Sequence, residues 1–82
     1  MPERTLRERA HDVEVTVWVG KAGIDAVVEE LSDQLDDREL VKAKFLRAAR
    51  GGTTTEELAD ELAGRVGADV VETRGHTAVF NR

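Results

Sequence analysis

The sequence predicts a mixed α/β domain in which helices pack on one small β-sheet. Two stretches with alternating apolar residues predict strands, and two stretches with apolar residues at helical spacing predict helices. A third apolar segment, interrupted by a glycine, predicts a closing hairpin. With an ambiguous first segment, the expected order is α-β-α-β-α-β-β in a single two-layer domain covering residues 1–82. Strand–helix–strand successions imply parallel strands and the hairpin is antiparallel, so the sheet should be mixed and four-stranded.

The first strand is expected over residues 13–19, "VEVTVWV", because apolar and polar residues alternate strictly. Its other face should carry Glu14, Thr16 and Trp18. The four valines are expected to share the buried face: Val13, Val15, Val17 and Val19. This half-buried pattern fits a strand with one face on the core.

A helix is expected over residues 24–37, because apolar residues recur from Ile24 to Leu35 at the spacing of one helical face. Asp25 in its first turn suits the positive end of the helix dipole. The second strand, residues 40–46, should place Lys42 and Lys44 on one face and its apolar residues on the other.

The stretch "TTTEELADELAGRVG" predicts the clearest helix, with Thr54 and Glu57 fitting a capping box and Gly67 a C-terminal cap. The final strands should meet at a tight connection formed by Arg74, Gly75 and His76. Residues 2–12 are consistent with a short docked helix or a frayed tail.

Composition narrows the class of protein. The chain has no cysteine and no apolar run long enough to span a bilayer, and its first residues lack the apolar region of a signal peptide. We therefore expect a soluble, cytoplasmic, monomeric domain. His11 and His76 are the only histidines and have no ligand-like spacing, so we expect no metal site. No catalytic constellation or cofactor motif is present, which favours a non-enzymatic role.

The net charge of −5 hides an asymmetry along the chain. Acids concentrate in the helix expected over residues 24–37, whereas residues 40–55 and 73–82 contain bases and no acid. Lysine is scarce and acids are plentiful, which suggests adaptation to high salt. The segregated charges are also compatible with an ordinary helix surface.

Gly20-Lys21-Ala22-Gly23 joins the first strand to the following helix. Glycines there admit a phosphate backbone, free amides at a helix start favour an anion, and Lys21 adds a mobile charge. KH domains use a GxxG loop in this way to clamp RNA. The same glycines can also serve a plain turn, so both interpretations stay open.

Further bases and one aromatic residue extend this candidate RNA-binding surface. Trp18 lies two residues before the loop, where it could stack on a base or pack against a helix or the first segment. The second-strand lysines could follow phosphates or form a solvated face, and His76 could donate to phosphate or cap its turn. The bases are Lys42, Lys44, Arg47, Arg50, Arg74 and Arg82.

Three linked motifs resemble those of the YhbY-like proteins, the stand-alone form of the CRM (chloroplast RNA splicing and ribosome maturation) domain: "VGKAGI", "ELVKAKFL" and "GADVVETRGHTAVFNR". The resemblance covers about residues 13–81 and is strongest to archaeal members. It implies an RNA-binding domain similar in fold to the C-terminal domain of translation initiation factor three. It also implies ribosomal RNA or precursor large-subunit particles as partners.

The resemblance maps the family's RNA-contacting loop to residues 20–23, its basic strand to Lys42 and Lys44, and its hairpin to residues 74–76. We therefore expect an RNA-binding protein acting during large-subunit assembly, with no cofactor, membrane or small-molecule substrate. The alternative is a protein-interaction module in which the acidic helix 24–37 docks on a basic ribosomal or other partner. A third interpretation, a small-ligand regulatory domain, lacks any pocket signal in the sequence.

Overall fold

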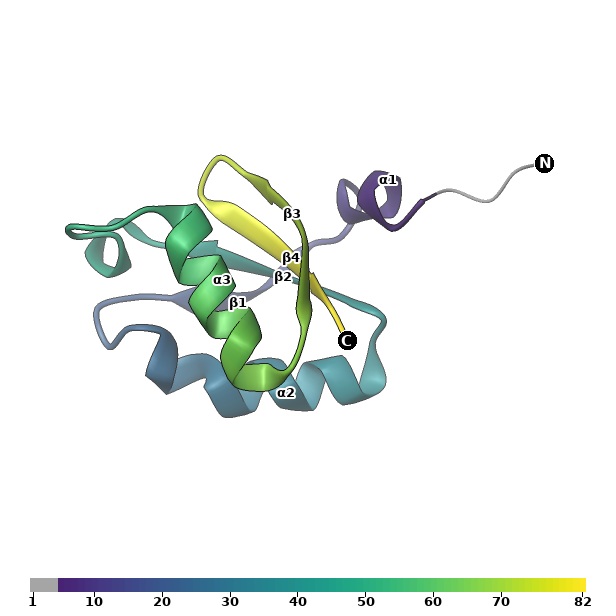
Figure 1. Cartoon of the computed structure of the whole chain (residues 1–82), viewed down its shortest axis with the longest axis horizontal. Helices are drawn as coiled ribbons and strands as arrows, with labels where there is room; N and C mark the ends of the chain where they lie inside the picture. Colours follow the sequence, from purple (N-terminus) through teal and green to yellow (C-terminus); the bar gives the residue numbers. More distant parts are fainter. Residues whose placement is uncertain (1–4) are drawn as a thin grey trace.

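The computed structural model describes residues 5–82 and confirms the expected order of elements (Figure 1). The part of the first segment before Thr5 lies outside the described residues. Two 3₁₀ turns, η1 and η2, lie between the regular elements. The elements are α1 (Leu6–Ala10), β1 (Val15–Val19), η1 (Ile24–Val27), α2 (Val28–Asp37), β2 (Leu40–Phe45), η2 (Arg47–Ala49), α3 (Thr55–Val66), β3 (Asp69–Arg74) and β4 (Thr77–Asn81).

The strands form a four-stranded mixed sheet in the order β1-β2-β4-β3. β1 and β2 are parallel, and β4 runs antiparallel to both of its neighbours, β2 and β3. Consequently β1, β2 and β3 all finish at the same end of the sheet, and β4 begins there. We call this the loop end of the sheet, because the connections after β1, after β2 and between β3 and β4 all lie there.

The two long helices α2 and α3 pack on one face of the sheet, which we call the helix-covered face. Its apolar core joins both helices to three strands. Its largest fully buried members are Phe45, Phe80, Leu31, Leu62, Val17, Val19 and Val41. Burying such side chains contributes roughly 1.5–3 kcal/mol each, which stabilises a chain without disulfides.

The other face of the sheet, the open face, is covered only in part. Helix α1 lies against it and buries Ala10 in a small apolar cluster with Leu40 and Val79. A capping box starts this helix: the Glu8 amide donates to the Thr5 hydroxyl at 3.2 Å, and the Glu8 carboxylate accepts from the Thr5 amide. Of the two alternatives for the first segment, a docked helix or a frayed tail, the structure therefore shows the docked helix from residue 5 onward.

The expected alternation of β1 is wrong before Val17, because Val13 packs in the small cluster on the open face and not in the core with Val17 and Val19. The register pairs Val15 with Lys42 and Val17 with Ala43, so Thr16 is an extra residue in a β-bulge. Val15 consequently lies on the open face, opposite to Val17. The Thr16 hydroxyl instead reaches α2, where it donates to the Gln34 side chain at 2.5 Å.

The helix expected from Ile24 begins as the 3₁₀ turn η1 and becomes α-helical only at Val28. The capping box expected for α3 is also half formed. The Thr54 hydroxyl accepts from the Glu57 amide at 3.1 Å, but the Glu57 carboxylate accepts from the Thr53 hydroxyl instead of turning back to the cap. Gly67 ends α3 in the left-handed conformation, as expected.

Candidate functional site

Backbone hydrogen bonds hold three separate segments together at the loop end of the sheet. The Leu46 amide donates to the Val19 carbonyl at 2.8 Å, and the Phe45 amide donates to the His76 carbonyl at 2.8 Å. The loop of residues 20–23, the segment 44–50 and the hairpin 74–77 therefore lie side by side. The parallel pairing of β1 with β2 is what carries the first two segments to the same end.

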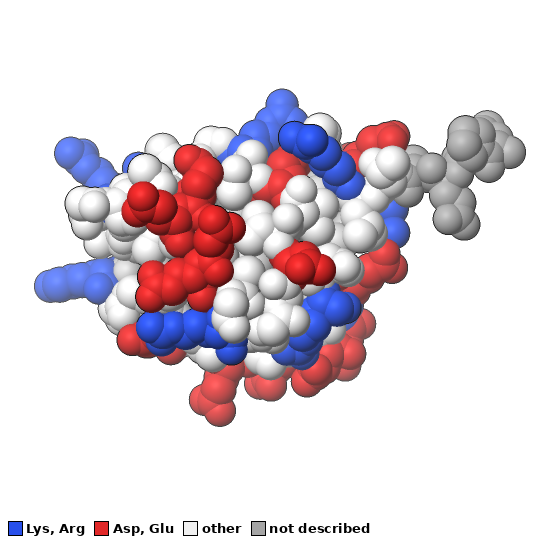
Figure 2. Space-filling view, viewed as in Figure 1, with Lys and Arg blue, Asp and Glu red and all other residues white. Residues whose placement is uncertain are grey.

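These three segments contain bases and no carboxylate. In Figure 2, Lys and Arg side chains project from the left end of the molecule, where Figure 1 places the loops after β1 and β2. Acids gather instead over α3 and below it, along α2. The cations brought together are Lys21, Lys44, Arg47, Arg50 and Arg74.

The loop of residues 20–23 is a tight turn with two open amides. The Gly23 amide donates to the Gly20 carbonyl at 2.9 Å, so it is not free as the helix-start argument expected. Lys21 and Ala22 are exposed, and within residues 5–82 their amides have no hydrogen-bond partner. The loop can therefore offer two peptide N–H groups and one ammonium to an anion.

Two of the candidate bases, Arg47 and Arg50, differ in whether their side chains are engaged by the protein. Arg47 is exposed in η2, whereas the half-buried Arg50 donates from Nε to the Phe45 carbonyl at 3.0 Å and so braces the turn. In the hairpin, Arg74 and His76 are exposed on either side of Gly75, whose φ of +56° fits a two-residue turn. Both ends of this turn are available to a ligand.

Arg82 is not part of this surface. It follows the far end of β4, where Asn81 pairs with Leu40. Its guanidinium donates to the Ser32 carbonyl at 2.8 Å and the Val66 carbonyl at 3.0 Å, and it also pairs with Asp36. The structure thus separates Arg82 from the loop and gives it a role in joining α2 to α3.

Trp18 is solvent-exposed, with 55% of its surface accessible, so none of the described residues 5–82 buries it. Leu46, which was not among the expected site residues, is 39% exposed immediately after β2. Its place two residues after Lys44, in an alternating strand, could have indicated that it points the same way. Lys42 lies further from the loop end, half-buried and paired with Val15 and Val79.

One ion pair and one histidine–carboxylate hydrogen bond attach α1 and the residue after it to the sheet. Arg9 contacts Glu39 at 2.7 Å, and His11 contacts Glu72 at 2.9 Å. The hydrogen bond and charge of Arg9 lower the pKa of Glu39, and the hydrogen bond from His11 lowers the pKa of Glu72. Arg7 of α1 and His11, the residue after α1, therefore hold Glu72 next to the exposed part of the open face.

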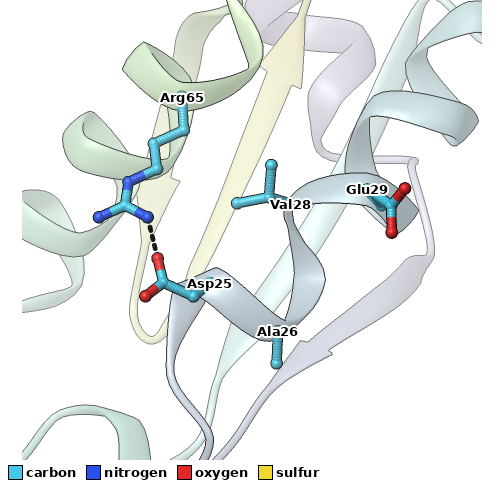
Figure 3. Close-up of a pocket in the computed structure, with 5 residues that line it drawn as sticks. All are labelled: Asp25, Ala26, Val28, Glu29 and Arg65. Carbon is cyan, nitrogen blue, oxygen red and sulfur yellow. Dashed lines mark hydrogen bonds and ion pairs between the residues drawn. The ribbon is translucent and has the colours of Figure 1, made fainter.

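A surface pocket of about 440 Å³ lies between η1, α2 and α3 (Figure 3). Arg65 from α3 and Asp25 from η1 point toward each other across it and form an ion pair, while Glu29 points away. The two charged groups that face each other across the pocket are thus already paired. Within residues 5–82 no group of three or more His, Cys, Asp or Glu could hold a metal ion. In the same residues no helix is long and apolar enough to cross a bilayer.

Comparison with known proteins agrees with this architecture. The chain is 40% identical over 80 residues to a probable RNA-binding protein of Methanocaldococcus jannaschii, covering 98% of this chain and 60% of that relative. It also resembles the solution structure of a Staphylococcus aureus protein proposed to bind RNA, at a TM-score of 0.77 and 29% identity over 94% of this chain and 79% of the other. Residues 2–82 match the CRS1/YhbY (CRM) domain, and the chain belongs to this family.

Proposed function

We propose that this chain binds structured RNA through the loop end of its sheet. The observation that carries the proposal is the convergence of residues 20–23, 44–50 and 74–77, which bring bases and open amides to one end without a carboxylate. Phosphate binding depends on such cations. The RNA-binding descriptions of the two relatives support the same class of ligand.

The charges also limit the direction that RNA can take across this end. The first turn of α3 carries Glu56 and Glu57, which repel phosphate and offset the positive end of that helix. The loop of residues 20–23 has Lys21 and no acid before Asp25, which already pairs with Arg65. RNA is therefore expected to enter along the β1 loop and the open face, away from α3.

Replacing Lys21 by Glu should weaken RNA binding by about fivefold or more at 0.1 M salt, because one phosphate contact is lost. The change leaves the fold intact, since Lys21 is exposed. Arg38→Glu is the matched control: it makes the same change in net charge at an exposed site after α2, at the far end of the sheet. Fluorescence anisotropy with a large-subunit ribosomal RNA fragment would measure both. Equal affinities of the two variants would remove the loop from the site.

We further infer a role in assembly of the large ribosomal subunit, without catalysis, as the family resemblance implies. Crosslinking to RNA in native cells at native salt, followed by sequencing, tests it. A sharp peak in large-subunit ribosomal RNA supports this role, and a background RNA profile argues against it.

The exposed acids of α2 favour a second candidate, docking on a basic protein. Most of them have no basic partner in the described chain; Asp36 is the exception, through Arg82. Recovery of a specific protein partner after nuclease treatment, lost when α2 acids are neutralised, would support this candidate. Loss of all partners with nuclease would contradict it.

A further inference from the structure

One row of side chains crosses all four strands next to the loop end of the sheet. The register pairs Trp18 of β1 with Lys44 of β2, Lys44 with Thr77 of β4, and Thr77 with Arg74 of β3. Directly paired residues on neighbouring strands project from the same face. With strands about 4.8 Å apart, this row, which we call the Trp18–Arg74 row, extends about 14 Å.

The row lies on the open face, and no element within residues 5–82 buries it. The adjacent row carries Val79, which α1 buries, and Glu72, whose carboxylate is held by His11 and Arg7. Beyond it toward the loop end, Trp18, Lys44 and Arg74 are all exposed. The row therefore presents an accessible indole with two cations and no acid of its own.

Exposure of Trp18 has no evident benefit for stability. The core of the helix-covered face is complete without it, and a large aromatic side chain on a strand is normally buried. Trp18 also lies next to the loop of residues 20–23. Gly20 follows it by two residues and has no side chain, so a ligand strand could pass unobstructed from Trp18 to the loop. A Cβ at Gly20 would meet only Leu46, at 3.8 Å.

We propose that the Trp18–Arg74 row binds single-stranded RNA, with an unpaired base stacked on the Trp18 indole. Lys44 and Arg74 contact the phosphates on either side, and the strand continues to the loop of residues 20–23. A base within a duplex is already stacked on both faces, so the row discriminates in favour of unpaired segments. This inference rests on the proposed RNA-binding function and names the class of RNA that the site takes.

Trp18 is the only tryptophan, so its fluorescence reports on the row directly. The full chain is titrated with a uridine decamer and with a ten-base-pair RNA duplex. Stacking should quench the fluorescence with the decamer and not with the duplex. Quenching by the duplex at equal or higher affinity would overturn the proposal.

Labelled decamer and fluorescence anisotropy extend the test to variants of Trp18. Trp18→Leu keeps an apolar side chain without an aromatic face and should weaken binding roughly 5- to 150-fold, whereas Trp18→Phe should lose much less. Lys44→Gln should lower the slope of log affinity against log salt by about 0.7, the loss of one single-strand phosphate contact. Because these side chains are exposed, the melting temperatures should remain close to wild type.

The outcomes distinguish failure of the Trp18–Arg74 row from failure of the proposed RNA-binding function. If Trp18→Leu binds the decamer like wild type while Lys21→Glu binds weakly, the row is not part of the site and RNA binding through the loop stands. If neither the decamer nor the ribosomal fragment binds, the proposed function itself fails. Dimerisation that depends on Trp18 in sedimentation experiments would assign the row to a second copy of this chain and overturn the proposal.

Discussion

At the scale of single residues, the two glycines of the loop have different physical roles. Gly23 has φ +81° and ψ −175°, a region that is essentially restricted to glycine, whereas Gly20 has no positive φ. Nothing lies within 4 Å of a Cβ built on Gly23, so its constraint is conformational and not steric. Gly23 shapes the turn, and Gly20 leaves space beside the strand end.

Replacing Gly23 by Ala should therefore destabilise the fold by about 1–3 kcal/mol, the usual cost of such strain. Gly20→Ala should change stability by less than about 0.5 kcal/mol, because its added methyl makes an ordinary contact with Leu46. Urea unfolding of both variants measures the difference. Equal destabilisation would mean that backbone strain does not distinguish the two positions. Lys21 is consequently the better position for testing RNA binding alone.

At the scale of elements, α1 is attached to the open face by a small apolar cluster and by two carboxylates of lowered pKa, Glu39 and Glu72. A carboxylate with a folded pKa below its unfolded value stabilises the folded state above the unfolded pKa, near pH 4.5. This stabilisation is lost as the pH falls through the folded pKa. The docking of α1 is therefore expected to weaken in acid.

We expect the amides of α1 to lose protection from hydrogen exchange below about pH 4.5, before the core strands do. Glu72→Gln should already loosen α1 at pH 7 and make its protection less dependent on pH. Glu14→Gln, at an exposed position before β1, is the matched control and should behave like wild type. Identical pH profiles of the three proteins would contradict a role for Glu72 in holding α1.

Local patterns predicted the elements well and their relationships poorly. Alternation predicted β1 and β2, helical spacing predicted α2 and α3, and an apolar segment interrupted by a glycine predicted the hairpin of β3 and β4, because each element buries one face in the core. The bulge at Thr16 could not be read locally, since it depends on the pairing of β1 with β2 and on the contact with Gln34. For the same reason, the sequence could group the bases but could not exclude Arg82 or align Trp18 with Arg74.

At the scale of the whole molecule, the bases of the loop end lie apart from the acids of α2, although other bases form ion pairs with acids elsewhere on the surface. The bases converge at the loop end through tertiary structure, whereas the acids of α2 are repeated along one helix. Molar salt removes most of the phosphate contribution to RNA binding. If the chain works at high salt, as its acidic composition suggests, a larger share of affinity must come from contacts that salt does not screen. Stacking on Trp18 is such a contact.

The acids of α2 also make a prediction about stability. Glu29, Asp33 and Asp37 are exposed and spaced four residues apart, so each neighbouring pair is repulsive by about 0.2–0.5 kcal/mol. Asp33→Lys replaces two repulsions by two attractions and should stabilise the protein by about 1 kcal/mol in low salt, raising its melting temperature by about 4–8 °C. In about 1 M KCl the screening length falls to about 3 Å, and this advantage should disappear as the wild type itself becomes more stable.

Glu14→Lys makes the same change in net charge outside the helices and isolates the local effect from the global one. Thermal unfolding of the three proteins across a KCl series provides the measurement. A gain limited to Asp33→Lys would locate the repulsion on α2, and equal gains would assign it to the net charge of −5. Wild-type stability that does not change with KCl would count against salt adaptation, and the acidic face of α2 would then need a binding partner to explain it.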